Sequence, residues 1–310
     1  MPELVQRLVD DAYERFRFDT EGATSPVYPA LERVPGHLFG IAVGGVSGAT
    51  YAAGDAEAEH TIMSVAKPFL YALVCQEFGW REVGRLVGVN ATGLPFNSLA
   101  AIEQSPDGRT NPMVNPGAIA VTSLVPGGDP AEKWRFIMDG LSRFAGRQLE
   151  VDTDVYGSAS ETNHRNRAAA RLLESYGRMY SDPAEAVDLY TRQSCLVVTA
   201  RDLAAMGATL ANGGVNPITH DGVVEPETCH ATLAVMTTAG LYETSGDWLY
   251  DIGLPGKSGI GGGIVTVAPG KGGLGTFAPL LDEASVKGQL AAAFLSRRLG
   301  LDLFATEAGE

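Results

Sequence analysis

Ser64 and Lys67, three residues apart, are the pair of side chains in this sequence best suited to nucleophilic chemistry. At helical spacing the two lie on one face, about one turn apart. A lysine whose pKa is lowered by burial or by nearby cations can take the proton of such a serine. Pro68 lacks the N–H that a helix interior needs, so the helix is expected to begin at or just after Ser64, where backbone N–H groups favour developing negative charge. Because this short pattern also occurs by chance, other segments have to support a serine nucleophile with a lysine base.

A second segment, Lys257-Ser258-Gly259, lies far downstream and leads into a glycine-rich run that predicts a strand. The glycines at 261–263 would allow another backbone or a ligand to approach closely. The letters Gly256-Lys257-Ser258 also match the end of a phosphate-binding loop. The first glycine of such a loop would fall on Asp251, and a strand rather than a helix follows. The segment therefore favours one wall of a site over a nucleotide-binding loop.

Two segments with asparagines could supply polar contacts. In residues 111–117 (NPMVNPG), prolines fix the backbone around Asn111 and Asn115, so the amides could be aimed at a ligand. Turn-forming asparagine is the alternative. Arg165-Asn166-Arg167 opens a predicted helix, where such groups can hold a carboxylate. A capped helix with a solvated basic turn is the alternative there.

Composition and charge exclude several other classes. The chain has 310 residues, 45% of them apolar, which is enough for one large core or two subdomains. With a net charge of −14 and no Lys/Arg-rich run, a nucleic-acid partner is not expected. No apolar run approaches the roughly 20 residues of a membrane span, and the charged residues 2–18 predict an amphipathic helix rather than a signal peptide. The histidines lack zinc-type spacing, so no metal is expected, and three widely spaced cysteines predict buried thiols in a reducing, cytoplasmic compartment.

The predicted elements place strands at the two ends of the chain and helices between them. Residues 39–53 and 260–280 each predict two short strands around a turn. Apolar density predicts a buried helix over 64–78, and apolar periodicity predicts helices over 131–145, 164–177, 183–194, 200–212, 226–239 and 286–299. Residues 87–130 lack such periodicity and predict a long functional loop region. We expect residues 1–80 and 240–310 to form a sheet-plus-helix lobe and residues 81–239 an inserted helical lobe.

In this order, S-x-x-K followed far downstream by K-S-G resembles the penicillin-recognising serine hydrolases, and the chain resembles most closely the serine-dependent glutaminases that share their fold. The resemblance runs over nearly the whole sequence. Its segments are 64–69 (SVAKPF), 111–115 (NPMVN), 165–168 (RNRA), 190–193 (YTRQ), 199–203 (TARDL), 211–214 (ANGG), 240–242 (GLY) and 256–260 (GKSGI). The resemblance implies an α/β (α+β) protein of the β-lactamase/transpeptidase-like fold, with an antiparallel sheet flanked by helices and an all-helical lobe.

The resemblance also implies roles for individual residues. Ser64 would attack the side-chain amide of L-glutamine, Lys67 would be its base, and either Tyr190 or Tyr242 would relay a proton to the leaving ammonia. The backbone N–H groups of Ser64 and Ile260 would form the oxyanion hole, and Lys257 would add positive charge that lowers the pKa of Lys67. The implied catalytic residues are Ser64, Lys67, Tyr190, Tyr242 and Lys257, and the implied substrate-binding residues are Ser64, Asn115, Asn166, Tyr190, Tyr242, Ser258 and Ile260. From the residues alone, a tyrosine at the end of an apolar helix usually anchors packing, with its hydroxyl bonded to a partner.

One departure from the family pattern bears on substrate binding. The family has a glutamate seven positions before Asn166, expected to hold the substrate's ammonium group, and this chain has Ala159 there. Glu161 could substitute if the loop is remodelled. Two alternatives follow: another serine amidase or β-lactamase-like hydrolase with Glu161 as deacylation base, or a weakened glutaminase homologue that acts as a binding protein.

The expected partner is a small molecule, L-glutamine, with no cofactor, no nucleic acid and no membrane. The resemblance implies a homodimer or homotetramer.

Overall fold

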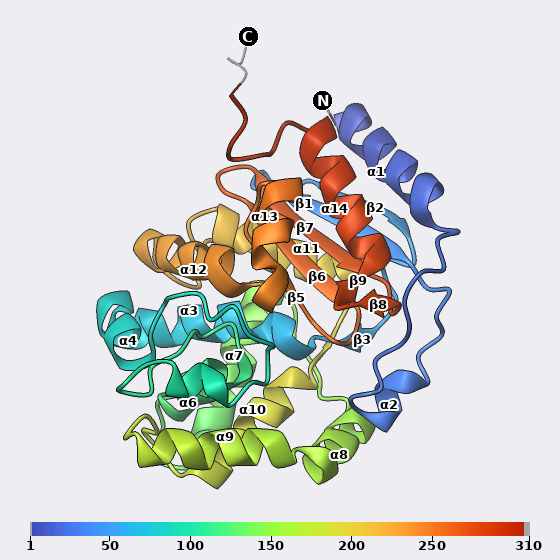
Figure 1. Cartoon of the computed structure of the whole chain (residues 1–310). Helices are drawn as coiled ribbons and strands as arrows, with labels where there is room; N and C mark the ends of the chain where they lie inside the picture. The colour runs from blue at the N-terminus through green and yellow to red at the C-terminus, as the bar shows by residue number, and fades with distance from the viewer. Residues whose placement is uncertain (1, 307–310) are drawn as a thin grey trace.

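A five-stranded antiparallel sheet joins the two ends of the chain in the computed structural model, which describes residues 2–306 (Figure 1). Its strand order is β2-β1-β7-β6-β5. The strands are β1 (Gly40–Gly45), β2 (Thr50–Gly54), β5 (Gly256–Ser258), β6 (Gly263–Ala268) and β7 (Gly272–Phe277). Strand β1 pairs with β7 in register from Gly40 opposite Phe277 to Gly45 opposite Gly272. The predicted pairing of N-terminal and C-terminal strands in one antiparallel sheet is therefore confirmed.

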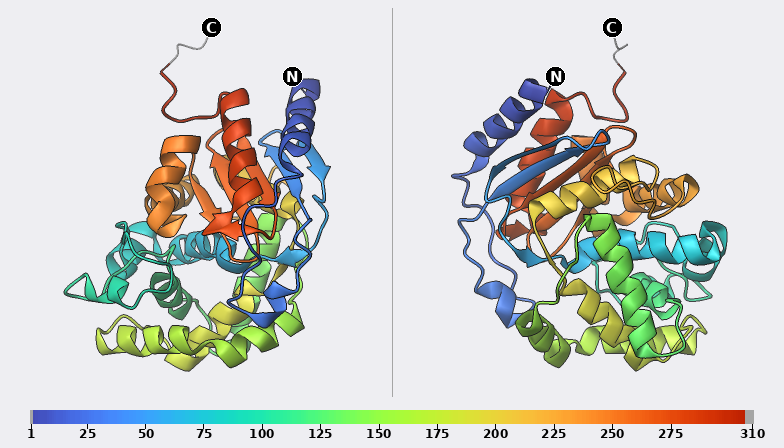
Figure 2. Two further views of the ribbon diagram at one scale, coloured as in Figure 1. Left: turned by 45° about the vertical axis from the view of Figure 1, so that its right-hand side comes forward. Right: turned by 180° about the vertical axis from the view of Figure 1, so that it is seen from behind.

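Helices cover both faces of this sheet (Figure 2). Helices α1 (Pro2–Phe16) and α14 (Val286–Arg298) pack together on one face, and α11 (Ala200–Ala211) crosses the other. The alternation along β1 explains the two layers, because successive side chains of a strand point to opposite faces. Ile41 joins the apolar cluster under α1 and α14, whereas Ala42 packs against α11.

Glycines in β7 let α11 approach the sheet backbone closely. A Cβ atom added at Gly275 would lie 2.1 Å from Ala200 O, and one added at Gly273 would lie 2.4 Å from Ala208 N. Both are contacts with helix backbone, which cannot give way as a flexible side chain can. The glycine-rich sequence of this strand is therefore required by helix packing.

The rest of the chain is mostly helical and surrounds the buried helix α3 (Ala66–Phe78). Helices α4, α6, α7 and α12 contact α3 directly, and α9 and α10 pack on α6. The bounds are α4 (Trp80–Val87), α5 (Ala100–Glu103), α6 (Asn115–Ser123), α7 (Pro130–Ala145), α8 (Thr153–Thr162), α9 (His164–Ser175), α10 (Pro183–Ser194) and α12 (Pro226–Ala239). The smaller elements are α2 (Pro29–Glu32), β3 (His60–Thr61), the 3-10 turns Met63–Val65 and Tyr242–Thr244, β4 (Val197–Val198), α13 (Ser245–Ile252), β8 (Leu281–Asp282) and β9 (Ala284–Ser285).

The predicted long loop region over 87–130 contains a helix that periodicity could not reveal. All nine residues of α6 are buried, so it has no polar stripe. Pro116 occupies its first turn, where a missing N–H costs nothing. Gly117 allows Asn111 to pass close by, since an added Cβ there would lie 1.9 Å from Asn111 O.

The predicted division into two lobes stays a prediction, and α11 bears on where the boundary lies. Its residues fall within the range 81–239 that was assigned to the helical lobe, yet it packs on β7, β1 and β6. A helix that is buried nearly all round gives no sequence signal for which neighbour covers it.

Among residues 2–306, no helix is long and apolar enough to cross a membrane. Cys75, Cys195 and Cys229 are free thiols and are buried, as predicted.

Candidate active site

Ser64 lies in the 3-10 turn that leads into α3, as the position of Pro68 predicted. The segment before it is held on both sides. Strand β3 pairs with β4, and the Ile62 N–H donates to Leu196 O at 2.8 Å. Met63 has φ 48°, a left-handed conformation that is uncommon for a residue with a side chain. Such strained backbone persists only where its surroundings fix it, and here it sets the direction of the next side chain, Ser64.

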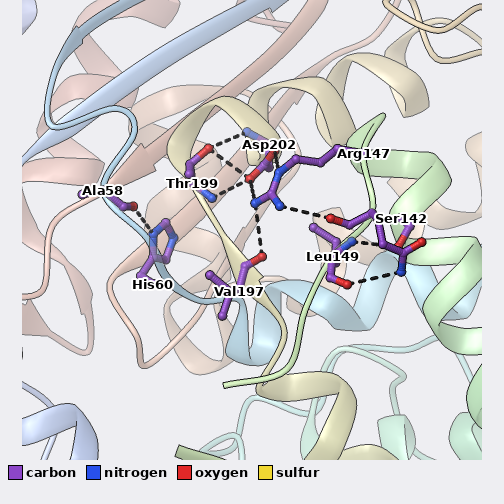
Figure 3. A network of polar contacts seen from close by, with 9 residues as sticks. Ala58, His60, Ser142, Arg147, Leu149, Val197, Thr199 and Asp202 are labelled. Carbon is purple, nitrogen blue, oxygen red and sulfur yellow. Dashed lines mark hydrogen bonds and ion pairs between the residues drawn. The ribbon is translucent and has the colours of Figure 1, made fainter. Parts of the chain in front are cut away.

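A polar network behind β4 anchors this arrangement (Figure 3). The Arg147 guanidinium binds both carboxylate oxygens of Asp202, at 2.9 and 2.7 Å, and also donates to Val197 O at 3.4 Å. The same carboxylate accepts bonds from the N–H and hydroxyl of Thr199, which caps α11. The network therefore ties β4 to the helix on the sheet.

Lys67 reaches Ser64 directly. Its Nζ lies 2.7 Å from Ser64 Oγ and 2.7 Å from Asn115 Oδ1. Its side chain is only 2% exposed, and burial lowers the pKa of Lys67 from 10.5 to about 7. A lysine with that pKa is neutral in a large fraction of molecules at neutral pH, and a neutral amine can accept the Ser64 proton.

Asn115 connects the lysine to two further helices. Its Oδ1 also accepts a hydrogen bond from the Tyr190 hydroxyl at 2.9 Å, and its Nδ2 donates to Asn166 Oδ1 at 3.0 Å. Asn115 begins α6, Asn166 lies in the first turn of α9, and Tyr190 lies in α10. The three predicted substrate-binding residues are thus brought together, within one network that includes Lys67.

Asn111, the other asparagine of that motif, holds the fold. Its Nδ2 lies within 3.1 Å of Val89 O, Asn90 O and the Thr238 hydroxyl, and its Oδ1 accepts from Met113 N–H at 2.8 Å. Of the two interpretations of this motif, a structural asparagine therefore fits Asn111, and an amide at the site fits Asn115.

Lys257, in the edge strand β5, is fully buried and contacts backbone. Its Nζ donates to Gly240 O and Ser258 O, each at 2.7 Å, and lies 3.9 Å from the centre of the Tyr242 ring. Burial and then the like charge of Lys67 lower the pKa of Lys257 well below its usual value. For Lys67 itself, burial is the cause of the lowered pKa.

Tyr242 lies between the two lysines. Its ring centre is 5.6 Å from Lys67 Nζ, and its hydroxyl donates to Ser258 O at a long 3.4 Å. Burial raises its pKa above the usual value, and a hydrogen bond with Ser64 opposes that rise. Like Met63, it has a left-handed backbone, with φ 57°.

The glycine-rich turn after β5 lies against the segment that carries Ser64. A Cβ atom at Gly261 would lie 2.8 Å from Thr61 O, and one at Gly259 would lie 3.1 Å from Ile62 O. The predicted close approach of another backbone is therefore confirmed, and the approaching backbone is the one just before Ser64.

A pocket opens in front of Ser64. Five predicted site residues line it: Ser64, Asn115, Asn166, Tyr190 and Ile260. The other lining residues are Val27, Tyr28, Met63, Phe96, Asn97, Ala159, Thr162, Asn163, Arg165, Thr191, Ser194 and Cys195. Lys67, Tyr242, Lys257 and Ser258 are buried and are not among these lining residues.

Tyr28 is a polar lining residue that sequence reasoning missed. Burial raises the pKa of its hydroxyl to about 12. It precedes the four-residue helix α2 in a proline-bearing connection. No local pattern marks such a residue as part of a site, because it is brought there by the return of the chain.

Ala159 and Glu161 differ in burial. Ala159 stands where the family pattern has a glutamate, and Glu161 is the residue that could substitute for it. Ala159 is fully buried in the pocket wall beside Met63 and Cys195. Glu161 is exposed, and it does not line the pocket. Both are in α8, where two residues are about 200° apart around the axis. The structure therefore does not place Glu161 as a substitute contact or as a deacylation base.

The two arginines in the first turn of α9 also differ in whether they line the pocket. Arg165 lines the pocket and donates through Nε to Asn97 O at 2.6 Å. Arg167 is exposed and donates to Ser160 O instead. Within residues 2–306, no three His, Cys, Asp or Glu side chains are grouped so as to hold a metal ion.

Comparisons with known proteins agree over almost the whole chain. The family model described as Glutaminase matches residues 22–304. Glutaminase 2 of Yersinia pestis is 65% identical over 308 residues, covering 99% of this chain and 91% of the relative. A glutaminase of Colwellia psychrerythraea is 44% identical and covers 97% of each chain. The solved structure of the probable glutaminase ybaS superposes with a TM-score of 0.95 at 41% identity, covering 97% of this chain and 98% of that one.

Proposed function

The chain belongs to the glutaminase family, and we propose that it releases ammonia from the side-chain amide of L-glutamine through an ester on Ser64. As a glutaminase it is an amidohydrolase, and it has the β-lactamase-like fold of the solved glutaminase structures, as the resemblance implied. The observation that carries the mechanism is the 2.7 Å separation of Lys67 Nζ and Ser64 Oγ at the wall of the pocket.

In the first step, neutral Lys67 takes the proton of Ser64 while Oγ bonds to the amide carbon Cδ of the substrate. Burial supports this role, because it lowers the pKa of Lys67 to about 7. We assign the backbone N–H groups of Ser64 and Ile260 as the donors to the oxygen that becomes negatively charged. Losing one such donor typically costs ~3 kcal/mol of barrier.

In the second step, the bond from Cδ to the amide nitrogen breaks and the nitrogen leaves as ammonia after gaining a proton. This proton comes from Lys67, and we assign Tyr242 as the residue that relays it to the leaving nitrogen. Both hydroxyls hydrogen-bond with Ser64, but the Tyr190 hydroxyl also donates to Asn115 Oδ1 at 2.9 Å, whereas the Tyr242 hydroxyl reaches Ser258 O only at 3.4 Å. A hydroxyl whose proton is not held by a short bond to a fixed acceptor can pass that proton on and accept another.

In the third step, a water molecule gives a proton to Lys67 and attacks the ester carbon. The Cδ–Oγ bond breaks, Ser64 regains its proton, and L-glutamate is released.

The remaining site residues position the reactants. Asn166 Oδ1 accepts from Asn115, which leaves Asn166 Nδ2 as a donor to the substrate carboxylate. Asn115 and Tyr190 line the same pocket. Lys257 fixes Ser258 and the Tyr242 ring, so we propose it as a positioning residue.

Ammonia release by the whole chain tests this function. Wild type at millimolar L-glutamine should release ammonia, and Ser64→Ala should reduce the rate by at least about a thousandfold. Ser194→Ala is a matched control, since Ser194 also lines the pocket but donates to Tyr190 O. Release that survives in Ser64→Ala would overturn the mechanism.

The cytoplasmic location and the homodimer or homotetramer stay predictions. Light scattering after size exclusion would give the oligomeric state.

A further inference from the structure

The pocket in front of Ser64 has an uneven charge. Among the described residues that line it, none is an aspartate or a glutamate, and Arg165 is the one with a full charge. A substrate whose amide carbon has reached Ser64 Oγ therefore meets no carboxylate among these lining residues, whatever the position of its α-substituents.

Free L-glutamine carries an ammonium group at its α-carbon, and the described residues that line this pocket offer that group no opposite charge. A buried ammonium needs an opposite charge or several free acceptors. Asn115 Oδ1 already accepts from Lys67 and Tyr190, and Asn166 Oδ1 accepts from Asn115. The Arg165 guanidinium repels a second cation but attracts the α-carboxylate.

The wall at Ala159 is apolar. Ala159 packs in a cluster with Leu31, Met63, Val155 and Cys195, and Ile260 packs against that cluster. At another point of the lining, Val27 is 43% exposed. An uncharged, partly apolar substituent loses little on contact with such a wall, whereas a charged one loses its hydration.

We propose that this chain prefers glutamine whose α-nitrogen is acylated, an N-acyl-L-glutamine, over free L-glutamine. The inference rests on the proposed function and names its substrate class. Acylation makes the α-nitrogen a neutral amide, and the acyl group adds apolar surface. The chemistry at Ser64 is unchanged: Oγ bonds to Cδ, ammonia leaves with the relayed proton, and water releases the N-acyl-L-glutamate.

Wild-type kinetics test the preference without any variant. Ammonia release is measured with N-acetyl-L-glutamine and with L-glutamine, with Ser64→Ala as the blank for each. The ratio of kcat/KM should favour the acetylated substrate by at least about tenfold, the size expected for one uncompensated charge. A ratio of one or less overturns the inference.

Ala159→Glu tests the cause. The carboxylate should raise kcat/KM for L-glutamine by about tenfold to a hundredfold and lower it for N-acetyl-L-glutamine. Ala159→Gln is the matched control, of nearly equal size without the charge, and should not raise kcat/KM for L-glutamine. The assigned cause is overturned if Ala159→Gln raises kcat/KM for L-glutamine as much as Ala159→Glu does. It is also overturned if a folded Ala159→Glu protein still prefers N-acetyl-L-glutamine.

The two proposals fail in distinguishable ways. Ser64-dependent release from L-glutamine but not from N-acetyl-L-glutamine overturns only the substrate preference. No Ser64-dependent release from either overturns the proposed function and the preference together.

Discussion

Lys67 and Lys257 are both buried lysines near one pocket, yet their surroundings differ in kind. Lys67 Nζ contacts two side chains, Ser64 Oγ and Asn115 Oδ1. Lys257 Nζ contacts two backbone carbonyls, Gly240 O and Ser258 O. The pKa of each is lowered by burial. A lowered pKa alone therefore does not identify a catalytic base, and the contact with the Ser64 hydroxyl is what makes Lys67 the proposed base.

The difference predicts that one lysine supports activity and the other supports the fold. Without Lys67, Asn115 Oδ1 still accepts from Tyr190. Without Lys257, two carbonyls in a buried region lose a donor. Such unpaired groups cost about 1–3 kcal/mol each.

The largest expected effect belongs to Lys67→Met. Removal of the base should lower kcat by about a thousandfold, because general-base catalysis contributes about 10²–10⁴. The thermal midpoint should stay at or above the wild-type value, since a buried amine is lost without orphaning a carbonyl. A stopped assay for ammonia and a melting curve measure both. A Lys67→Met protein with wild-type kcat would remove the distinction between the two lysines.

Tyr242→Phe should have the next largest effect. The ring over Lys257 stays, so stability should change little, but loss of the relaying hydroxyl should lower kcat by about a hundredfold. Tyr190→Phe is the comparison, because it loses the bonds to Asn115 and Ser64 but not the proposed relay, and it should lower kcat less. The reverse order of the two rates would assign the relay to Tyr190.

The pH dependence should follow Lys67. Burial lowers its pKa to about 7, and its neutral form is the active one. kcat/KM should fall about tenfold per pH unit below about 7 and level off above it. The free energy of unfolding should also rise with pH between about 7 and 10.5. In that range the unfolded chain binds the Lys67 proton and the folded chain does not. Activity that is flat from pH 5 to 9 would argue against Lys67 as base.

Lys257→Met should have the smallest effect on rate and a clear effect on stability. We expect the free energy of unfolding to fall by about 2 kcal/mol, because Gly240 O loses the Lys257 donor and Ser258 O keeps only the long contact with the Tyr242 hydroxyl. kcat should fall by less than in Lys67→Met. Urea unfolding gives the first quantity. A larger loss of kcat than in Lys67→Met, with unchanged stability, would make Lys257 the catalytic lysine.

Local sequence rules revealed the parts of this site that depend on neighbours in the chain. The spacing of Ser64 and Lys67 and the position of Pro68 placed the helix start, and the glycines after Lys257 indicated a close approach. Strand-forming segments at the two ends of the chain predicted one sheet. The roles that the resemblance implied for individual residues still await the kinetic tests.

Long-range packing decided what local rules could not. Asn111 and Asn115 occupy similar positions in one proline-bound motif, but only Asn115 faces the lysine. Tyr28 comes to the pocket from a connection without periodicity. The surroundings of Ala159 are set by residues from α2, α8 and the segment before α3. Such contacts join residues far apart in the sequence, so no window of the sequence contains them.

Mass spectrometry of the acid-quenched enzyme would test the Ser64 ester most directly. A γ-ester of L-glutamate with a good leaving group, with its α-nitrogen either free or N-acetylated, speeds formation of the Ser64 ester, so the acyl-enzyme should accumulate. We predict that the peptide containing Ser64 gains one glutamyl or N-acetylglutamyl group, and that Ser64→Ala gains none. An acyl group on a different residue, retained in Ser64→Ala, would contradict the mechanism.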